Sequence, residues 1–423
     1  MVNTEYLPRI ADKELELKLA TSGAVLIVGP KWCGKTKTAE MISKSALYMQ
    51  NPDYSSEYKL LADSLPSKLL EGETPRLLDE WQDAPVLWNA VRFAVDQRRK
   101  RGQFVLTGSV VPPQADDMHT GAGRISRMTM RTMSLFESGE SSGQISLTDL
   151  FDEKMDMSGE SKQLVNQIAF ILTRGGWPEA VLETNDTYAL QLIYNYLDVI
   201  IHHDISRIDG VERNPDRVLS LLRSISRNIS TQAATSTLVG DLASNDEAIS
   251  NKTVDDYINT LKKLYVVEDL PAWSPSLRSK RAIRTTAKRH FVDPSIAAAS
   301  LNANSSKLLN DFNTFGFLFE SLCIRDLRIY SNAISGKVYH YRDQLNNEVD
   351  AIIQLRDERW GAIEIKMGAG EIEIAANKLI KFSDDIDDTK MPKPSFLMVL
   401  TATEFAFQMK NGVWVVPLAC LRN

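Results

Sequence analysis

The octapeptide GPKWCGKT at residues 29–36 matches the phosphate-binding pattern G-x-x-x-x-G-K-[ST] at every fixed position. The apolar run AVLIV at residues 24–28 predicts a buried strand before it, and residues 35–46 are predicted to form a helix after it. Two glycines let such a loop bring backbone N–H groups close to phosphate oxygens, at the positive end of the helix. The lysine reaches the β- and γ-phosphates, and the threonine hydroxyl is a Mg²⁺ ligand. The predicted site for ATP and Mg²⁺ comprises Gly29, Pro30, Lys31, Trp32, Cys33, Gly34, Lys35, Thr36 and Lys37, with Lys35 also catalytic and Thr36 on the metal.

A second motif, PRLLDEWQ at residues 75–82, places two acids at the end of an apolar strand. Asp79 is positioned to hold Mg²⁺, and Glu80 is the natural group to polarise the attacking water. An acidic strand end that caps a helix would look the same in isolation. Paired with the loop upstream, the two acids favour a catalytic pair.

Polar and basic residues follow the third predicted strand. Thr107, in VLTGS, either senses the γ-phosphate or serves simple turn chemistry. The stretch GRISRMTMR at residues 123–131 holds Arg124, Arg127 and Arg131. One of them is a candidate for stabilising transition-state charge, within the chain or from a neighbouring subunit, and we favour Arg124. The alternative is a solvated basic edge strand.

The alternation of elements predicts the fold class. Strands at 24–28, 76–79 and 102–109 alternate with helices at 35–46 and 86–99, which indicates an α/β fold with a parallel sheet. Helices dominate beyond residue 152, at 162–173 and 187–207, and a hairpin is expected within 266–294. The Ser-, Gly- and acid-rich stretch 137–160 is predicted to be an insertion or a mobile linker.

Composition restricts the class of protein only broadly. The chain has 423 residues, 43% apolar and 25% charged, with a net charge of -6, so a basic surface for nucleic acid has to be local. No apolar run approaches the roughly 18 residues of a membrane span, and we expect no membrane association. Three widely spaced cysteines suggest neither disulfides nor a zinc site, and a cytoplasmic location is expected.

A second constellation lies near the C-terminal end. Asp350 is on one predicted strand, Glu364 and Lys366 share one face of the next, and Glu320 lies on the preceding helix. This arrangement is similar to the Asp, Glu-x-Lys pattern of restriction-endonuclease-like domains, and the order helix, three strands, helix, strand agrees with that fold. The resemblance implies a Mg²⁺ nuclease site. Cross-strand charge pairing explains the same residues without catalysis.

The predicted hairpin is strongly basic. A winged-helix unit with such a hairpin would contact DNA phosphates. The alternatives are a solvated face or a patch for an acidic domain. The candidate DNA-binding residues are Arg278, Lys280, Arg281, Arg284, Lys288 and Arg289, followed by His290.

Three stretches together resemble prokaryotic AAA-type ATPases close to the archaeal-type ATPases: GPKWCGKT, LLDEWQDAPVLWNAVRFAVDQRRKRGQFVLTGS and GRISRMTMRTMSLFES. Later stretches, RGGWPEA, YLDVIIHHDISRI, HFVDPSIAAASL and FGFLFESLCIRDLR, resemble that group's C-terminal domain of unknown function. The loop residues Trp32 and Cys33 are unusual for it.

The predicted domains follow from these observations. They are a P-loop ATPase core at 1–150, a helical lid at 151–210, a winged-helix-like module at 211–295 and a restriction-endonuclease-like domain at 296–423. We expect a Mg²⁺-dependent ATP-hydrolysing switch that acts with DNA, either as an ATP-regulated nuclease or with an inactive C-terminal binding module. A homo-oligomer or a partner protein is compatible with both, and a small-molecule kinase is disfavoured by the appended domains.

Overall fold

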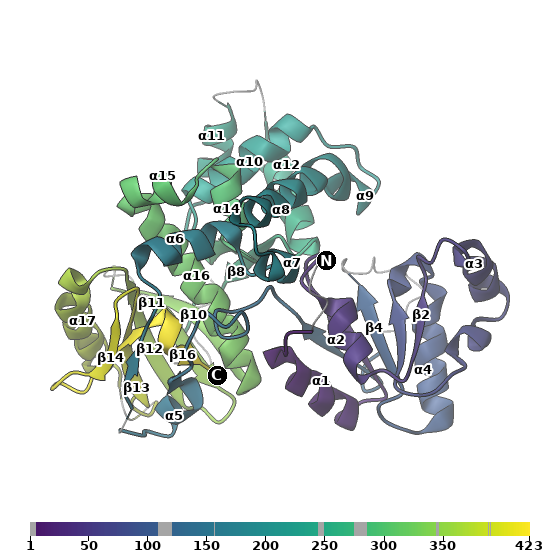
Figure 1. The fold of residues 1–423 in the computed structure, drawn as a ribbon, viewed down its shortest axis with the longest axis horizontal. Helices are drawn as coiled ribbons and strands as arrows, with labels where there is room; N and C mark the ends of the chain where they lie inside the picture. The colour runs from purple at the N-terminus through teal and green to yellow at the C-terminus, as the bar shows by residue number, and fades with distance from the viewer. Residues whose placement is uncertain are drawn as a thin grey trace. The chain divides into compact units, whose positions relative to one another are not determined.

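The computed structural model describes residues 6–108, 121–155, 157–243, 249–274, 286–343, 347–387, 389 and 391–423. The chain divides into two compact units. The N-terminal unit runs to Thr132 and includes Lys263–Tyr265, and the C-terminal unit comprises Met133–Lys262 and Val266–Asn423. Each unit is described by itself below (Figure 1).

The N-terminal unit is built on a five-stranded parallel sheet with strand order β2-β3-β4-β1-β5. The strands are β1 (Ala24–Val28), β2 (Ser45–Tyr48), β3 (Arg76–Asp79), β4 (Phe104–Gly108) and β5 (Ile125–Thr129). The predicted α/β fold with a parallel sheet is confirmed. The strand β2 is not in the prediction, because the helix expected to reach residue 46 ends at Ile42.

Helices cover both faces of this sheet (Figure 1). They are α1 (Ile10–Thr21), α2 (Lys35–Ile42), α3 (Ser55–Ser64) and α4 (Val86–Arg98), with 3-10 turns at Pro66–Leu70 and Trp81–Asp83. Alternate residues of each strand point to opposite faces. Leu26 and Leu106 therefore pack with Trp88 of α4, whereas Ile27 and Val105 pack with Leu15 of α1.

The first part of the C-terminal unit is helical. It contains α6 (Val165–Arg174), α7 (Pro178–Leu182), α8 (Asp186–Val199), a π-helical turn (Ile200–Asp204), α9 (Ile205–Arg207), α10 (Pro215–Arg227), α11 (Thr235–Ala243), α12 (Asn251–Lys263), α14 (Ser295–Ser300) and α15 (Ser305–Asn310). Strands β8 (Val267–Leu270) and β9 (Lys288–Phe291) pair antiparallel, as expected for the two arms of the predicted hairpin. Residues 275–285 between them lie outside the described part of the chain.

The second part is a seven-stranded sheet, with order β10-β11-β12-β13-β15-β14-β7. Its elements are α16 (Phe312–Ala333), β10 (Gly336–Arg342), β11 (Glu348–Leu355), β12 (Trp360–Lys366), α17 (Ile372–Asp384), β13 (Phe396–Thr401), β14 (Phe405–Gln408) and β15 (Trp414–Pro417). The first three strands pair antiparallel, and β12 and β13 pair parallel across α17. The predicted order of helix, three strands, helix and strand is present.

The described residues of the stretch 137–160 form regular elements, so the mobile-linker alternative is wrong and the insertion alternative stays a prediction. It contains β6 (Ile145–Ser146), α5 (Leu147–Phe151) and β7 (Gly159–Glu160). β6 pairs with β16 (Leu421–Arg422), and β7 pairs with β14. Residues 133–150 thus belong to the C-terminal unit and not to the ATPase core in which the sequence placed them.

Candidate functional site

The loop at residues 29–36 has the backbone that the glycines of its pattern permit. Gly29 has φ 151° and Gly34 has φ 99°, both in the region that favours glycine. A Cβ on Gly29 would lie 2.1 Å from the carbonyl oxygen of Met130, so no other residue fits there. The helix α2 begins at Lys35, whose Nζ donates to the carbonyl oxygens of Gly29 (3.0 Å) and Pro30 (2.7 Å). The loop therefore wraps around the lysine ammonium directly before a helix N-terminus.

Asp79 is the centre of a small hydrogen-bond cluster beside this loop. Its Oδ1 accepts hydrogen bonds from Thr36 Oγ1 at 2.7 Å and from Thr107 Oγ1 at 2.6 Å. Strand order explains the meeting, because β3, β4 and β1 are neighbours and their carboxyl ends share one edge. A carboxylate and two hydroxyls are oxygen ligands of the kind that Mg²⁺ prefers, so the donor set fits the predicted metal.

The Thr107 side chain makes a contact that the sequence did not indicate. This side chain is fully buried and is engaged with the Asp79 carboxylate. This hydrogen bond holds the Thr107 hydroxyl against Asp79, and the two roles expected from the sequence, γ-phosphate sensing and turn chemistry, stay predictions.

Glu80 follows Asp79 in a left-handed backbone conformation, with φ 51° and ψ 47°. Such a conformation is uncommon for a residue with a side chain and costs of order 1 kcal/mol or more, which the packing around it has to offset. The next residue, Trp81, is buried and stacks at a tilt on Trp88, which anchors the turn. Burial raises the pKa of Glu80, and the hydrogen bond donated by Gln82 opposes this rise only in part. Glu80 is thus a stronger base than an exposed glutamate.

The three candidate arginines lie at different places on β5. Arg124 is at the amino end of the strand, where its carbonyl oxygen accepts from Ala24 N at 3.0 Å and its Nε donates to Asp96 at 2.9 Å. The phosphate loop leaves the opposite end of the sheet, after Val28. Arg124 therefore lies away from the phosphate loop of its own chain, and of its two predicted roles the one in a neighbouring subunit stays a prediction.

The other two candidate arginines, Arg127 and Arg131, also lie at different distances from the phosphate loop. Arg127 donates to the hydroxyl of Tyr265. Arg131 follows the carboxyl end of β5, one residue after Met130, whose carbonyl oxygen lies against Gly29. Of the three, Arg131 is at the edge of the sheet that carries the phosphate loop.

Arg9 holds the phosphate loop in place by hydrogen bonds, a role that the sequence did not indicate. It is buried, and its guanidinium donates to the carbonyl oxygens of Cys33 at 2.8 Å and of Arg131 at 2.9 Å. It therefore ties the phosphate loop to the end of β5. A single arginine before a helix carries no motif, so no sequence signal was available for it.

Comparison with known families agrees with this geometry. Residues 21–138 match the family model of an AAA domain. The match supports an AAA-type P-loop ATPase domain in this part of the chain. Residues 165–307 and 315–421 match two models described as domains of unknown function, DUF8612 and DUF4143. No curated protein matches the chain.

Solved structures resemble the chain only weakly. A Walker-type ATPase of Pyrococcus abyssi is 14% identical, with a TM-score of 0.43 over 71% of this chain and 96% of that one. The Orc1 protein of Aeropyrum pernix in complex with DNA is 13% identical, with a TM-score of 0.26 over 71% and 94%. The Hef helicase domain of Pyrococcus furiosus is 10% identical, with a TM-score of 0.21 over 93% and 89%.

Outside the AAA domain, the structure brings the four predicted nuclease residues together in the C-terminal unit. The register of β11 with β12 pairs Ala351 with Ile363, which sets Asp350 beside Glu364. Lys366 Nζ lies 3.8 Å from Asp350 Oδ2 and 3.4 Å from Glu364 Oε2. Glu320 joins them from α16 through Lys288, which contacts both Glu320 and Asp350. The described residues contain no group of three or more His, Cys, Asp or Glu side chains arranged to hold a metal ion.

Burial and neighbouring charges shift the pKa values of the carboxyl groups in this cluster. Burial raises the pKa of Glu320, and burial together with nearby Asp350 raises that of Glu364. Burial also acts on Asp350, but the ammoniums of Lys288 and Lys366 outweigh it and hold the pKa of Asp350 below its usual range. Asp350 is therefore the most firmly ionised of the three carboxyl groups.

Lys288 is not a surface residue, which contradicts its predicted contact with DNA phosphates. Its residue exposure is 2%, because it and His290 lie on the face of β9 that meets α16. Arg289 points the other way and donates to the carbonyl oxygen of Ala233 at 3.0 Å. The remaining candidates, Arg278, Lys280, Arg281 and Arg284, lie outside the described residues.

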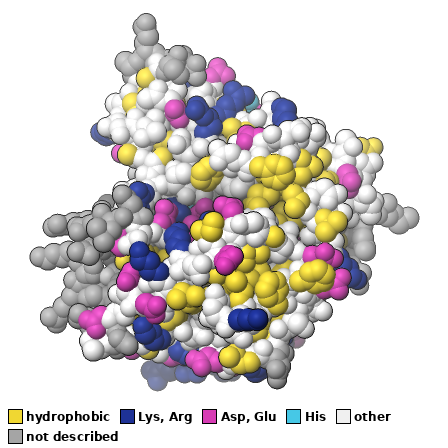
Figure 2. Space-filling view, turned by 90° about the vertical axis from the view of Figure 1, so that its left-hand side faces the viewer, with side chains coloured by type: hydrophobic (Ala, Val, Ile, Leu, Met, Phe, Trp, Pro, Cys, Tyr) yellow, Lys and Arg dark blue, Asp and Glu magenta, His cyan; other side chains and the backbone are white. Residues whose placement is uncertain are grey.

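Two further observations concern candidate partners. On the face drawn in Figure 2, the visible described Lys and Arg side chains are scattered among acidic and apolar ones and form no single broad basic surface. In the described part of the chain, no helix combines the length and apolar character that a membrane span needs.

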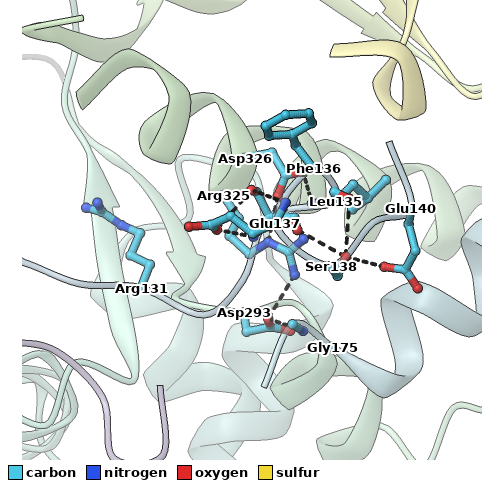
Figure 3. Close-up of polar contacts among 12 residues, drawn as sticks. Arg131, Leu135, Phe136, Glu137, Ser138, Glu140, Gly175, Asp293, Arg325 and Asp326 are labelled. Atoms are coloured by element: carbon cyan, nitrogen blue, oxygen red, sulfur yellow. Dashed lines mark hydrogen bonds and ion pairs between the residues drawn. The ribbon is translucent and has the colours of Figure 1, made fainter. Parts of the chain in front are cut away.

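A buried ion-pair node joins four distant stretches of the C-terminal unit (Figure 3). Arg325 donates to Asp293 Oδ2 through Nη1 (2.9 Å) and to Asp326 Oδ1 through Nε (2.8 Å), and all three side chains are at most 1% exposed. Asp326 Oδ2 accepts from the backbone N–H of Leu135, and Asp293 Oδ2 accepts from that of Gly176, both at 2.9 Å. The node therefore fixes the segment after the AAA domain's last strand, the RGGWPEA turn and the start of α14 onto α16.

The two glycines of RGGWPEA occupy positions at which a residue with a side chain would be strained. Gly175 has φ 77°, and a Cβ on Gly176 would lie 2.0 Å from the carbonyl oxygen of Met133. Arg174 beside them holds Glu140 with two hydrogen bonds, of 2.7 and 2.9 Å. The stretches RGGWPEA, HFVDPSIAAASL and FGFLFESLCIRDLR thus meet at one packing node.

Proposed function

We propose that the chain is a Mg²⁺-dependent ATP-hydrolysing switch. The observation that carries this proposal is the convergence of Thr36 and Thr107 on Asp79 beside the loop that surrounds Lys35. The AAA domain match supports ATP binding and hydrolysis, and the individual residue roles are our assignment.

Each side chain has one task in this assignment. The loop N–H groups and Lys35 bind the β- and γ-phosphates, and Thr36 and Asp79 hold Mg²⁺, which when bound neutralises phosphate charge. Glu80 orients the attacking water and accepts its proton, aided by its raised pKa. Thr107 keeps the Asp79 carboxylate in place, and Arg131 is the arginine at the correct edge to approach the γ-phosphate.

Nucleotide binding tests the loop assignment. Titration of a fluorescent ATP analogue should show saturable binding to the wild type and none to Lys35→Ala. Lys18→Ala, which alters a lysine ion-paired with Glu14 on α1, is the matched control and should bind as the wild type does. Equal affinity of Lys35→Ala and the wild type would refute the assignment.

The output of the switch is proposed to lie in the C-terminal unit. The helical part of this unit and the β8–β9 hairpin span the residues for which we propose a lid (151–210) and a winged-helix-like module (211–295). The basic residues around 278–284 are the chemistry in it that suits DNA phosphates. A filter-binding assay with duplex DNA, with and without ATP, tests this part. Binding that is unchanged by replacing those basic residues with Ser would contradict it.

A metal-dependent nuclease is a second candidate function, favoured by the meeting of Asp350, Glu364 and Lys366 on two adjacent strands. Plasmid is incubated with the wild type, Asp350→Ala and Glu364→Ala, in Mg²⁺ or Mn²⁺ and with or without ATP. Cleavage that both variants lose would establish the nuclease. Absence of cleavage in every condition would leave the C-terminal domain as an inactive protein- or DNA-binding module.

A further inference from the structure

Lys288 occupies the middle of the carboxylate cluster. Its Nζ lies 2.9 Å from Glu348 Oε1, 3.1 Å from Glu320 Oε1 and 3.9 Å from Asp350 Oδ1. These three carboxylates come from α16 and β11, whereas the lysine comes from β9. An ammonium group is thus surrounded by three acidic side chains from other elements.

The lysine is fixed there by its strand. β9 pairs with β8, so that Phe291 lies opposite Val267 at one end of the ladder and Lys288 lies opposite Leu270 at the other. His290, two residues on, contacts Ser321 of α16 at 3.3 Å, next to Glu320. The side chain of Lys288 is only 3% exposed, so its charge is neutralised by the cluster and not by water. Isolated buried charges of either sign are costly, and the ammonium and the carboxylates offset one another.

The remaining lysines serve the other side of the cluster. Lys378 of α17 donates to Glu364 Oε1 at 2.7 Å, and Lys366 lies near Glu364 and Asp350. Glu364 Oε2 is buried and accepts no hydrogen bond, although Lys366 Nζ is 3.4 Å away. The cluster therefore has one buried carboxylate oxygen that makes an ion-pair contact but accepts no hydrogen bond, together with a deeply buried ammonium between its other carboxylates.

Carboxylate oxygens are the ligands that Mg²⁺ and Mn²⁺ prefer, but with Lys288 in place the described side chains are not arranged to hold a metal ion. A divalent ion among these carboxylates would repel an ammonium a few ångströms away. We propose that Lys288 is the resident cation of this cluster and takes the place of a divalent metal ion while β9 is paired with β8. Metal-dependent chemistry at Asp350 and Glu364 then requires Lys288 to leave the cluster. The inference concerns the site of the second candidate function but does not rest on nuclease activity, since cation binding is measured without nucleic acid.

Lys288→Met tests the proposal, because it removes the charge and keeps the chain length. Mn²⁺ binding to the full-length protein without nucleotide is followed by electron paramagnetic resonance. We expect Lys288→Met to gain one Mn²⁺ per chain over the wild type, with affinity roughly tenfold or more higher at this site. The gain should disappear when Asp350→Asn is added. Lys378→Met removes an ammonium from the rim of the same cluster and is the matched control, which should gain no such site.

Thermal unfolding gives an independent readout. Mn²⁺ should raise the Tm of Lys288→Met and leave that of the wild type and Lys378→Met unchanged. If Lys288→Met does not fold without metal, the charge-balanced pair Lys288→Met with Glu320→Gln replaces it in both experiments. A folded Lys288 variant that gains no Mn²⁺, or a wild type that already binds Mn²⁺ in a manner lost in Asp350→Asn, would overturn the proposal. A cleavage result in the plasmid assay would not decide it.

Discussion

Replacing Thr107 with Val removes one hydroxyl from the Asp79 cluster at nearly constant volume. The hydroxyl is fully buried and donates to the Asp79 carboxylate at 2.6 Å. Hydrogen bonds to charged groups contribute about 1.5–3 kcal/mol. Since about 1.4 kcal/mol corresponds to a factor of ten, the variant should lose roughly tenfold to a hundredfold in the property that Asp79 controls.

That property, in our account, is the use of Mg²⁺. Steady-state ATP hydrolysis is measured against Mg²⁺ concentration at fixed ATP. Thr107→Val should need roughly ten to a hundred times more Mg²⁺ for half-maximal rate, and its rate should approach the wild-type value at saturation. Thr107→Ser keeps the hydroxyl and should restore most of the wild-type Mg²⁺ dependence. A lower kcat with an unchanged Mg²⁺ requirement would refute the positioning role and return Thr107 to γ-phosphate sensing.

Two further predictions follow from the same contacts. Burial raises the pKa of Glu80, and a base must be deprotonated to act, so ATP hydrolysis should be lost on acidification at a higher pH than for an ordinary glutamate. Gln82→Met removes a hydrogen-bond donor that lowers this pKa and should therefore shift the acid limb of the kcat–pH profile to higher pH. An acid limb at the wild-type pH would contradict the role of Glu80. Arg325→Met removes the guanidinium partner of two buried aspartates and should destabilise the C-terminal unit by about 3–5 kcal/mol in urea unfolding. Arg359→Met, at a half-exposed ion pair, should cost less than about 1 kcal/mol, and similar losses in both variants would contradict the importance of the node.

Local patterns were sufficient to predict the loop and the acidic strand end that the structure brings together. The loop at residues 29–36 and the acids at Asp79 and Glu80 each lie at the end of a buried apolar strand. Parallel strands place their carboxyl ends at one edge, so the meeting of Thr36 and Asp79 follows from strand type and order. The C-terminal constellation was predictable for the same reason, since spacing of two on a strand puts Glu364 and Lys366 on one face.

Interactions between distant residues were not predictable in this way. The basic run around Lys288 suggested a surface, but strand alternation sends Lys288 into the carboxylate cluster and Arg289 away from it. The choice between those faces depends on which side of β9 meets α16, which no local pattern encodes. Leu135, Asp293 and Arg325 meet across large separations in sequence for the same reason.

Very short strands also escape sequence patterns. β6 and β7 have two residues each, too few to show alternation, and they form because β16 and β14 offer free edges. The Ser- and Gly-rich composition around them therefore suggested a linker where the chain is paired into sheets.

The most direct test of the central claim is ATP turnover by Glu80→Gln in the presence of Mg²⁺. Phosphate release and nucleotide affinity are measured on the same preparation, beside the wild type. We predict that Glu80→Gln binds ATP with wild-type affinity and loses about 10²–10⁴-fold in kcat, the usual contribution of a positioned general base. Wild-type turnover by Glu80→Gln would contradict the assignment of this site as the centre of hydrolysis.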